Sequence, residues 1–307
     1  AETPESIREK GYRNLKPISP GFFGYSMLRN SVLSDWYNDL LGMCEAMDMG
    51  IEGLHTETGA GVLEAALRVD DALAATDKAA LFKIFTKVLA QKQGWLATFM
   101  AKWSKDWPGC GGHMHMSLWK GGKPVFFEEK APHRMSRTMR QFVGGQAALM
   151  PELLGMVASN VNSYRRLIPG FWAPTASTWG VENRTTSLRV IPGSAKSTRV
   201  EYRVAAADAN PYLAIAAAIG SGLWGIENDI DPGEPVMGNS YEKKHPAKSQ
   251  LPRTLMEAAG RLKASKPARD LFGAAFVDHY SATREWEERE FRKAITDWEL
   301  DRYMEII

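Results

Sequence analysis

The sequence predicts an α+β fold in which a mainly antiparallel sheet is covered by helices. Two observations lead to this class. Short segments of alternating apolar and polar residues gather early and in the middle of the chain, and segments with helical spacing flank them. No internal repeat or low-complexity tract interrupts this mixed order, which is typical of an α+β architecture.

Local signals, taken in chain order, justify each element. Residues 1–33 are expected to be irregular, because prolines punctuate them. Alternation and turn glycines predict two short strands around a turn within 51–69. The same signals predict single strands over 96–103, 111–119, 183–191 and 198–206. Apolar spacing, caps and closing glycines predict one helix over 34–50, capped by Ser34, and another over 76–94, capped by Thr76. Further helices are predicted over about 133–160 and 208–227, and two or three more follow to the C-terminus.

The 307-residue chain has an ordinary globular composition, with 44% hydrophobic and 24% charged residues. Its net charge of +2 gives no reason to expect nucleic acid or a membrane as a partner. The longest apolar stretch, 211–226, is short for a membrane span and predicts a buried helix. Cys44 and Cys110 make neither a disulfide framework nor a cysteine metal site, so we expect a cytoplasmic protein. The chain begins without methionine, and we expect a fragment or a processed chain.

The stretch "GGHMHMSLW" at 111–119 raises the first functional question. Strand alternation places His113, His115 and Ser117 on one face, and Met114 and Met116 on the other. This pattern fits a half-buried strand with satisfied histidines. It also fits a metal or nucleotide site, because neutral imidazole is a common ligand of divalent ions.

The stretch "HTETGAGVLE" at 55–64 predicts a hairpin with two opposed carboxylates. If Ala60 and Gly61 form a two-residue turn, Glu57 lies directly opposite Glu64. Carboxylates so placed repel each other. A divalent cation between them removes the repulsion, since hard ions bind carboxylate oxygens. The alternative is that both side chains face water.

The stretch "TRVEYRV" aligns Arg199, Glu201 and Arg203 on one strand face. Nearby segments add further cations, namely Arg165, Arg166, Arg184, Arg189 and Lys196. Such a row is either a solvated ladder of salt bridges or a polyanion site with a metal-binding carboxylate inside it. With the histidines and glutamates above, these are the groups that phosphoryl transfer from a nucleotide requires. No Walker or GxGxxG loop is present, so side chains and metals would hold the phosphates.

Seven motifs, in this order, resemble the catalytic domain of the glutamine synthetase family from about Tyr37 to the C-terminus. They are "HTETGAGVLE", "TFMAKW", "GHMHMSLW", "NSYRRLIPG", "ENRTTSLRV", "RVEYR" and "ADANPYLAIAAAI". The ordered set is specific where each motif alone is not, and it favours the metal and nucleotide interpretation of 111–119. The resemblance implies that a curved, mainly antiparallel sheet forms the active site.

The resemblance also implies a role for each matching residue. Glu57 and Glu64 match ligands of one Mg²⁺ or Mn²⁺ ion, and His113 and Glu201 match ligands of a second. The positions that match ATP contacts are His115, Ser117, Lys196, Arg199 and Arg189. Those that match glutamate contacts are Gly109, Arg166, Arg184 and Arg203, and the catalytic arginines would be Arg184, Arg203 and Arg189. The implied reaction joins glutamate and ATP into γ-glutamyl phosphate, which an amine nitrogen then attacks to form an amide.

The chain departs from the family pattern at three places. The N-terminal β-grasp domain and a strand with a Glu-x-Glu pair of metal ligands are absent from it, so we expect residues 1–307 to be a catalytic domain that is inactive alone. Pro108 stands where the family usually has asparagine. Trp172, in "GFWAP", stands where glutamine synthetases carry the glutamate that binds and deprotonates ammonium.

The residue type at Trp172 bears on which amine is used. An indole neither accepts a proton from ammonium nor offers it a negative charge. It gives an alkylammonium apolar surface and a cation–π face. We therefore expect ligation of glutamate to an amine other than ammonia, such as a polyamine or an alkylamine. If Trp172 only packs the loop, an ordinary glutamine synthetase that uses ammonia is the close alternative.

Two other classes of protein fit this sequence less well. A catalytically silent homologue, acting as a binding or structural protein, is disfavoured because the matching metal and phosphate positions carry the expected residue types. A zinc hydrolase is disfavoured because the other histidines lie in unrelated contexts, at His55, His133, His245 and His279. Tyr241 falls near a position adenylylated in some family members, but its surroundings match weakly and we do not predict that modification. The family's stacked rings imply a homo-oligomer, with small molecules as the other partners.

Overall fold

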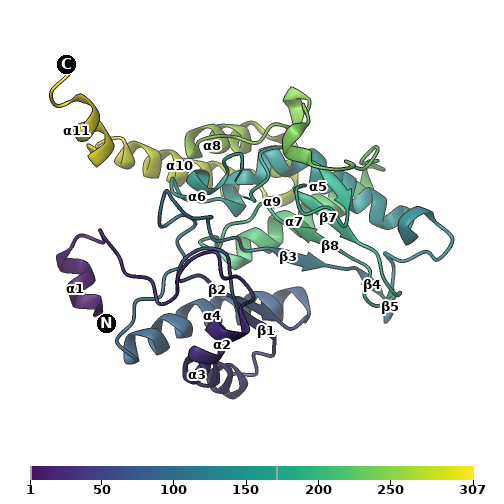
Figure 1. Cartoon of the computed structure of the whole chain (residues 1–307). Helices are drawn as coiled ribbons and strands as arrows, with labels where there is room; N and C mark the ends of the chain where they lie inside the picture. The colour runs from purple at the N-terminus through teal and green to yellow at the C-terminus, as the bar shows by residue number, and fades with distance from the viewer. Residues whose placement is uncertain (1, 171) are drawn as a thin grey trace.

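A four-stranded sheet lies at the centre of the larger part of the molecule (Figure 1). The structure is a computed structural model that describes residues 2–170 and 172–307. The strands lie in the spatial order β3 (Met114–Met116), β8 (Arg199–Tyr202), β7 (Leu188–Ile191) and β6 (Trp179–Val181). The pairs β3–β8 and β7–β8 are antiparallel, and β6–β7 is parallel. The predicted mainly antiparallel sheet is confirmed.

Helices cover one face of this sheet and enclose the main hydrophobic core. Val200 and Tyr202 of β8 are at most 1% exposed and belong to this core. The core lies between the sheet and two long helices, α5 (Arg137–Val157) and α7 (Pro211–Glu227). The predicted buried helix over 208–227 is α7, and Asn210 caps it through Tyr212 N at 2.9 Å. None of the described helices is long and apolar enough to span a membrane.

The C-terminal third completes this layer. Its helices are α8 (Leu255–Ala264), α9 (Lys266–Phe272), α10 (Ala274–Phe291) and α11 (Asp297–Tyr303). Figure 1 shows α8 and α10 above the sheet and α11 projecting near the C-terminus. A two-stranded ribbon, β4 (Trp119–Lys120) with β5 (Lys123–Pro124), extends from the end of β3.

The N-terminal third forms a smaller layer below the sheet in Figure 1. A hairpin, β1 (Ile51–Thr56) with β2 (Leu63–Leu67), packs near α3 (Ser34–Ala46) and α4 (Ala72–Lys92). Two short helices precede it, α1 (Pro4–Glu9) and α2 (Met27–Val32). The prediction that residues 1–33 are irregular is therefore wrong at these helices, whose N-caps are Thr3 and Ser26. The predicted pair of strands within 51–69 is confirmed.

Both predicted helix caps in this layer are wrong. Leu33 precedes α3, so Ser34 is already its first helical residue. Thr76 lies inside α4, where its hydroxyl donates to the Ala72 carbonyl at 2.6 Å. A threonine hydroxyl can satisfy itself on the preceding helical turn, so the same residue type that caps helices also occurs within them.

Four predicted strands are shorter than expected or missing. Of the strands predicted over 111–119 and 198–206, β3 covers only 114–116 and β8 only 199–202. Residues 96–103 run without strand pairing, and Lys102 N donates to the Asn162 side chain at 2.8 Å in place of a ladder bond. The predicted strand over 183–191 begins only at Leu188, because Asn183 forms a turn by accepting from Thr185 N at 3.0 Å. In the segments 96–103 and 183–191, side-chain amides take over backbone hydrogen bonds that a strand would make.

Candidate active site

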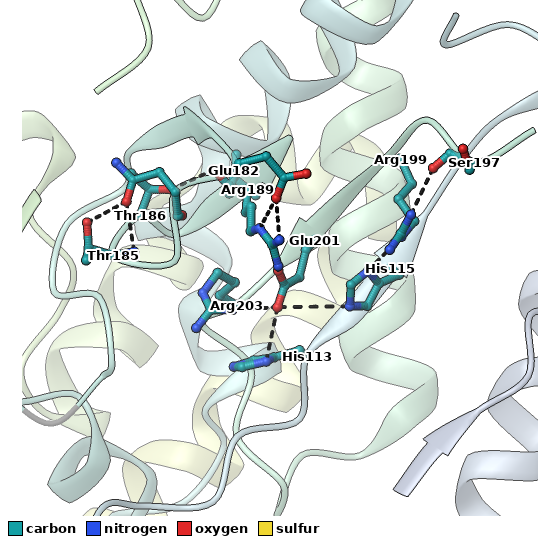
Figure 2. A network of polar contacts seen from close by, with 12 residues as sticks. His113, His115, Glu182, Thr185, Thr186, Arg189, Ser197, Arg199, Glu201 and Arg203 are labelled. Atoms are coloured by element: carbon teal, nitrogen blue, oxygen red, sulfur yellow. Dashed lines mark hydrogen bonds and ion pairs between the residues drawn. The ribbon is translucent and has the colours of Figure 1, made fainter. Parts of the chain in front are cut away.

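Glu201 is the centre of a charge network on the open face of the sheet (Figure 2). The residue is only 3% exposed. The carboxylate accepts hydrogen bonds from Arg189 Nη1 at 3.1 Å and from Arg203 Nη1 at 2.5 Å. On its other side, Nδ1 of His113 lies 3.2 Å and Nε2 of His115 lies 3.9 Å from Oε1 of Glu201. Two cations and two imidazoles therefore converge on one buried carboxylate.

Strand register brings these residues together from distant parts of the sequence. In the β3–β8 pair His115 lies directly opposite Glu201, and in the β7–β8 pair Arg189 does. On the other face, Met114 and Met116 pack against the core. The predicted division of the stretch 111–119 into a polar and an apolar face is confirmed.

The charge states of the network follow from its surroundings. Desolvation raises the pKa of Glu201, but the hydrogen bond with His113 and the charge of Arg203 outweigh it and hold this pKa well below its ordinary value. Desolvation lowers the pKa of His113 to about 4; its bond to Glu201 opposes this, and the charge of Arg203 adds to it. At neutral pH the site thus holds an ionised carboxylate beside a neutral imidazole, which is the form that binds a metal ion.

A second cluster lies on the β1–β2 hairpin. His55, Glu57 and Glu64 each offer one ligand atom, and these atoms lie within 4.8 Å of one another. His55 Nδ1 is buried without a hydrogen-bond partner among the described residues and lies 3.8 Å from Glu57 Oε1. Desolvation and the charge of Glu57 raise the pKa of Glu64. An orphaned imidazole nitrogen beside two repelling carboxylates is the donor set that a divalent cation satisfies, so these residues fit such an ion.

The hairpin differs in register from the prediction. Glu64 pairs with His55, and the Glu57 amide donates to the Val62 carbonyl at 2.8 Å. The turn therefore contains four residues, 58–61, and Glu57 does not lie directly opposite Glu64. The prediction that His55 lies in an unrelated context is also wrong. Its position two residues before Glu57 was the signal, because strand alternation puts both side chains on one face.

The two clusters interact electrostatically. The charge of Glu201 adds to the raised pKa of Glu64, after desolvation and the effect of Glu57. Desolvation and the charge of Glu57 raise the pKa of Tyr25, and the charge of Arg184 opposes them. The Tyr25 ring in turn lies 4.5 Å from the His55 ring. The carboxylates of the hairpin and of the sheet therefore lie close enough to repel each other.

Arg166 lies beside the C-terminal end of β8, which Arg203 directly follows. It ends the short helix α6 (Ser163–Arg166), is 3% exposed, and donates to the carbonyls of Val204 at 2.9 Å and Arg203 at 3.1 Å. Burial and the charge of Arg203 lower its pKa to about 10, which leaves it protonated at neutral pH. A Cβ on Gly109 would lie 2.8 Å from Arg166 Cγ and 2.5 Å from the Ala101 carbonyl oxygen. Only glycine fits there, so the backbone at 109 touches this arginine.

Of the residues predicted to bind ATP, Arg189 lies opposite Glu201, and Arg199 lies at the other end of β8. Arg199 begins this strand and donates to His115 Nδ1 at 3.1 Å and to the Ser197 carbonyl at 2.9 Å. Ser117, just past β3, accepts from Trp119 Nε1 at 3.0 Å. Lys196 is exposed and has no hydrogen bond or ion pair with any described residue.

Two residues that were predicted to belong to the site, Arg184 and Trp172, form no hydrogen bond or ion pair with the described residues around Glu201. Arg184 is exposed and forms no hydrogen bond or ion pair within the described part of the chain. Trp172 is 61% exposed and has a positive φ of 58° in the loop before Pro174. Sequence reasoning missed Glu182, which accepts from Arg189 Nε at 3.0 Å and holds that arginine over Glu201. No spacing signal marked Glu182, because it lies beyond the end of β6.

The family described as "Glutamine synthetase, catalytic domain" matches residues 8–303. This chain belongs to the glutamine synthetase family, as the seven motifs predicted.

Several individual proteins of known name or structure are similar to this chain. "Type-1 glutamine synthetase 2" of Dictyostelium discoideum is 47% identical over 311 residues, which cover 100% of this chain and 59% of that protein. A "Glutamate--isopropylamine ligase" of a Pseudomonas species is 39% identical over 303 residues, which cover 98% of this chain and 66% of that protein. The solved structure of a "GmaS/ADP complex" is similar with a TM-score of 0.85 and 29% identity, covering 94% of this chain and 68% of that one. The chain thus spans about 59% to 66% of the length of these two curated relatives.

Proposed function

We propose that this chain is the catalytic domain of an ATP-dependent ligase that joins L-glutamate to an amine other than ammonia through γ-glutamyl phosphate. One observation carries the proposal, the order of charges along β8. Arg199 lies at one end, the ionised Glu201 lies in the middle, and Arg203 with Arg166 lies at the other end. This order suits a nucleotide and a dicarboxylate that meet above a metal-binding carboxylate.

The metal-binding residues in this proposal come from both clusters. Glu57 and Glu64, joined by His55, would hold one Mg²⁺ or Mn²⁺ ion, and His113 with Glu201 would hold another. Such ions neutralise the charge of the phosphoryl group that is transferred. Support comes from the orphaned His55 nitrogen and from the neutral state of His113.

The remaining side chains would bind and orient the two substrates. Arg166 and Arg203, with the backbone at Gly109, would bind glutamate, because guanidinium groups pair with carboxylates in two-pronged geometry. The nucleotide would be held by His115, Ser117, Lys196, Arg199 and Arg189. Arg184 and Arg189, together with Arg203, would stabilise the charge that develops during phosphoryl transfer. Lys196 and Arg184 lack partners in the described chain, so both are available for a ligand.

Trp172 supports the choice of amine. Its exposed indole offers apolar surface where ammonia needs a carboxylate. Burial of an alkyl group contributes about 0.8 kcal/mol per CH₂, so two or three methylenes give roughly 15- to 60-fold selectivity over ammonia. A relative that uses isopropylamine, at 39% identity, points the same way.

An ordinary glutamine synthetase is the second candidate. It is favoured by the 47% identity to a relative with that name. The two candidates differ only in the nitrogen nucleophile, so the loop with Trp172 decides between them.

The experiment is a phosphate-release screen with the complete gene product, glutamate, ATP and a panel of ammonia, alkylamines, ethanolamine and polyamines. We expect kcat/KM for the best amine to exceed that for ammonia by at least about tenfold. Trp172→Glu should move the ratio toward ammonia, whereas Trp286→Ala, which removes another exposed indole from α10, should leave it unchanged. Wild-type preference for ammonia that survives Trp172→Ala assigns the chain to ordinary glutamine synthetases. ATP binding without phosphate release for any amine would instead indicate a silent homologue.

We also propose a compartment and an assembly. Cys44 and Cys110 are both free thiols, which supports a cytoplasmic protein. Large apolar side chains at the N-terminal layer are exposed, including Phe22 at 75% and Met27 at 84%, which supports a subunit interface in a homo-oligomer. Light scattering of the complete gene product tests the assembly.

A further inference from the structure

A very short helix carries Arg166, and its own hydrogen bonds are too few to hold it in place. Helix α6 has only four residues, and Asn162 before it makes no capping bond, because its side chain pairs with the backbone of Lys102 at 2.8 and 2.9 Å. A single helical turn is unstable by itself, since ordering its backbone gains few hydrogen bonds. Contacts with other segments must therefore set the direction of the Arg166 side chain.

Asp208 makes one of these contacts. It lies in the connection between β8 and α7, and its Oδ2 accepts from Ser163 Oγ at 2.7 Å and from Asn160 Nδ2 at 3.1 Å. The Ser163 hydroxyl in turn accepts from the Asn160 amide at 3.2 Å, and Ser163 is 0% exposed. Hydrogen bonds to an ionised carboxylate are stronger than those between neutral groups. One carboxylate oxygen thus fixes the first residue of α6 and the turn before it.

The same connection holds the other end of α6. Its backbone carbonyls at Arg203 and Val204 accept from the guanidinium of Arg166. Residues 203–208 therefore contact α6 twice, at its first residue through Asp208 and at its last through these carbonyls. Two separate attachments fix the rotation of a helical turn, which one attachment does not.

This attachment matters for the donors that Arg166 keeps free. A guanidinium has five N–H donors, and the two carbonyls take one from each terminal nitrogen of Arg166. Three donors are left for a ligand, and the orientation of α6 decides where they point. Binding of a carboxylate by such donors requires correct geometry, so a small rotation of the helix weakens it.

We propose that Asp208 is a positioning residue for substrate binding, which holds α6 so that the free donors of Arg166 point to the glutamate carboxylate. Asp208 acts through Ser163 and Arg166 and not by contact with the substrate. The inference rests on the proposed function, in which Arg166 binds glutamate. It adds a residue outside the arginine cluster that sets the affinity for the acid substrate.

The test replaces Asp208 in the complete gene product. Calorimetry with a non-hydrolysable ATP analogue measures glutamate affinity, and steady-state kinetics measure KM for glutamate and for ATP. We expect Asp208→Ala to raise the KM for glutamate about tenfold or more, with kcat and the KM for ATP within about twofold of wild type. Asp208→Asn keeps an oxygen that accepts from Ser163 and Asn160, so its KM for glutamate should return to within about threefold of wild type.

A second pair of variants separates positioning from a general loss of stability. Ser163→Ala removes the donor to Asp208 and should raise the KM for glutamate about threefold to tenfold. Ser221→Ala is the matched control, because Ser221 is 2% exposed and its hydroxyl donates to the Ala217 carbonyl at 2.7 Å within α7. Both variants lose a buried hydrogen bond and should unfold at a lower temperature, but only Ser163→Ala should change the KM for glutamate.

Three results would overturn the inference. They are glutamate affinity within twofold of wild type in Ser163→Ala and Asp208→Ala, an equal rise in KM in Ser221→Ala, and an Asp208→Asn variant as impaired as Asp208→Ala. If Asp208→Ala does not fold, Ser163→Ala and Asp208→Asn decide. In each case normal wild-type turnover leaves the proposed function standing. A wild-type protein that neither binds glutamate nor releases phosphate overturns both.

Discussion

At the scale of a single residue, Glu201 shows why the side chains of this site depend on one another. A buried carboxylate is costly unless it is paired and hydrogen-bonded. Arg189, Arg203 and His113 meet that requirement, and Glu182 in turn holds Arg189. Removing one partner would leave an uncompensated charge, so these side chains act as a unit.

The hairpin cluster leads to a prediction at the same scale. Glu57→Ala should lower turnover by about 10²-fold or more and abolish the rise in unfolding temperature that Mn²⁺ or Mg²⁺ causes, because the variant loses one of three convergent ligands. Differential scanning fluorimetry with and without a chelator measures the stabilisation, and phosphate release measures the turnover.

Glu52→Ala is the control for that variant. Glu52 lies on the same strand, β1, but is exposed and outside the cluster. We expect it to behave as wild type. Normal ion dependence in Glu57→Ala would remove this residue from the ligand set.

At the scale of elements, the crossing of α5 and α7 depends on glycines. A Cβ on Gly145 of α5 would lie 2.5 Å from Gly225 Cα of α7, a distance that real atoms do not adopt. The two backbones therefore touch, and this contact sets the depth of the core behind the sheet.

Gly225→Ala should accordingly destabilise the protein by about 1–3 kcal/mol or more, because the added methyl forces the helices apart. Gly260 offers a matched control inside α8, where an added Cβ meets nothing within 4 Å. Gly260→Ala should stabilise by about 0.5–1 kcal/mol, since alanine loses less entropy in a helix. Urea unfolding followed by circular dichroism measures both. Equal stability of the two variants would contradict the described crossing.

At the scale of the whole molecule, a few polar contacts join the N-terminal layer to the rest. Lys83 of α4 donates to the Ala209 carbonyl at 2.7 Å, just before α7, and lies 5.6 Å from the centre of the Phe99 ring. Burial lowers the pKa of Lys83. This contact helps to hold the hairpin cluster opposite Glu201.

Lys83→Met should lower stability by about 1–3 kcal/mol, because it keeps the aliphatic stem but leaves the Ala209 carbonyl unpaired. It should also raise the metal concentration required for activity, since the two carboxylate centres lie on the layers that this contact joins. Lys87→Met is the control: Lys87 lies 5.7 Å from the same Phe99 ring but is exposed and forms no hydrogen bond with any described residue of α7. Similar losses in both variants would assign the effect to the ring contact alone.

Much of the fold and site was predictable from local pattern. Alternation in "GGHMHMSLW" correctly separated His113 and His115 from the methionines, because side-chain direction in a strand depends only on the strand itself. The seven motifs predicted the family, which the match over residues 8–303 confirms. The ligand roles of Glu57, Glu64, His113 and Glu201 stay predictions.

The sequence by itself determined the residue types of the site and the faces on which they lie, since both follow from chemistry and strand period. Only the tertiary structure decided their partners. It placed His55 opposite Glu64, because the turn holds four residues and not two. Strand register, turn length and the packing of distant segments depend on contacts between residues far apart in sequence, which no local pattern contains.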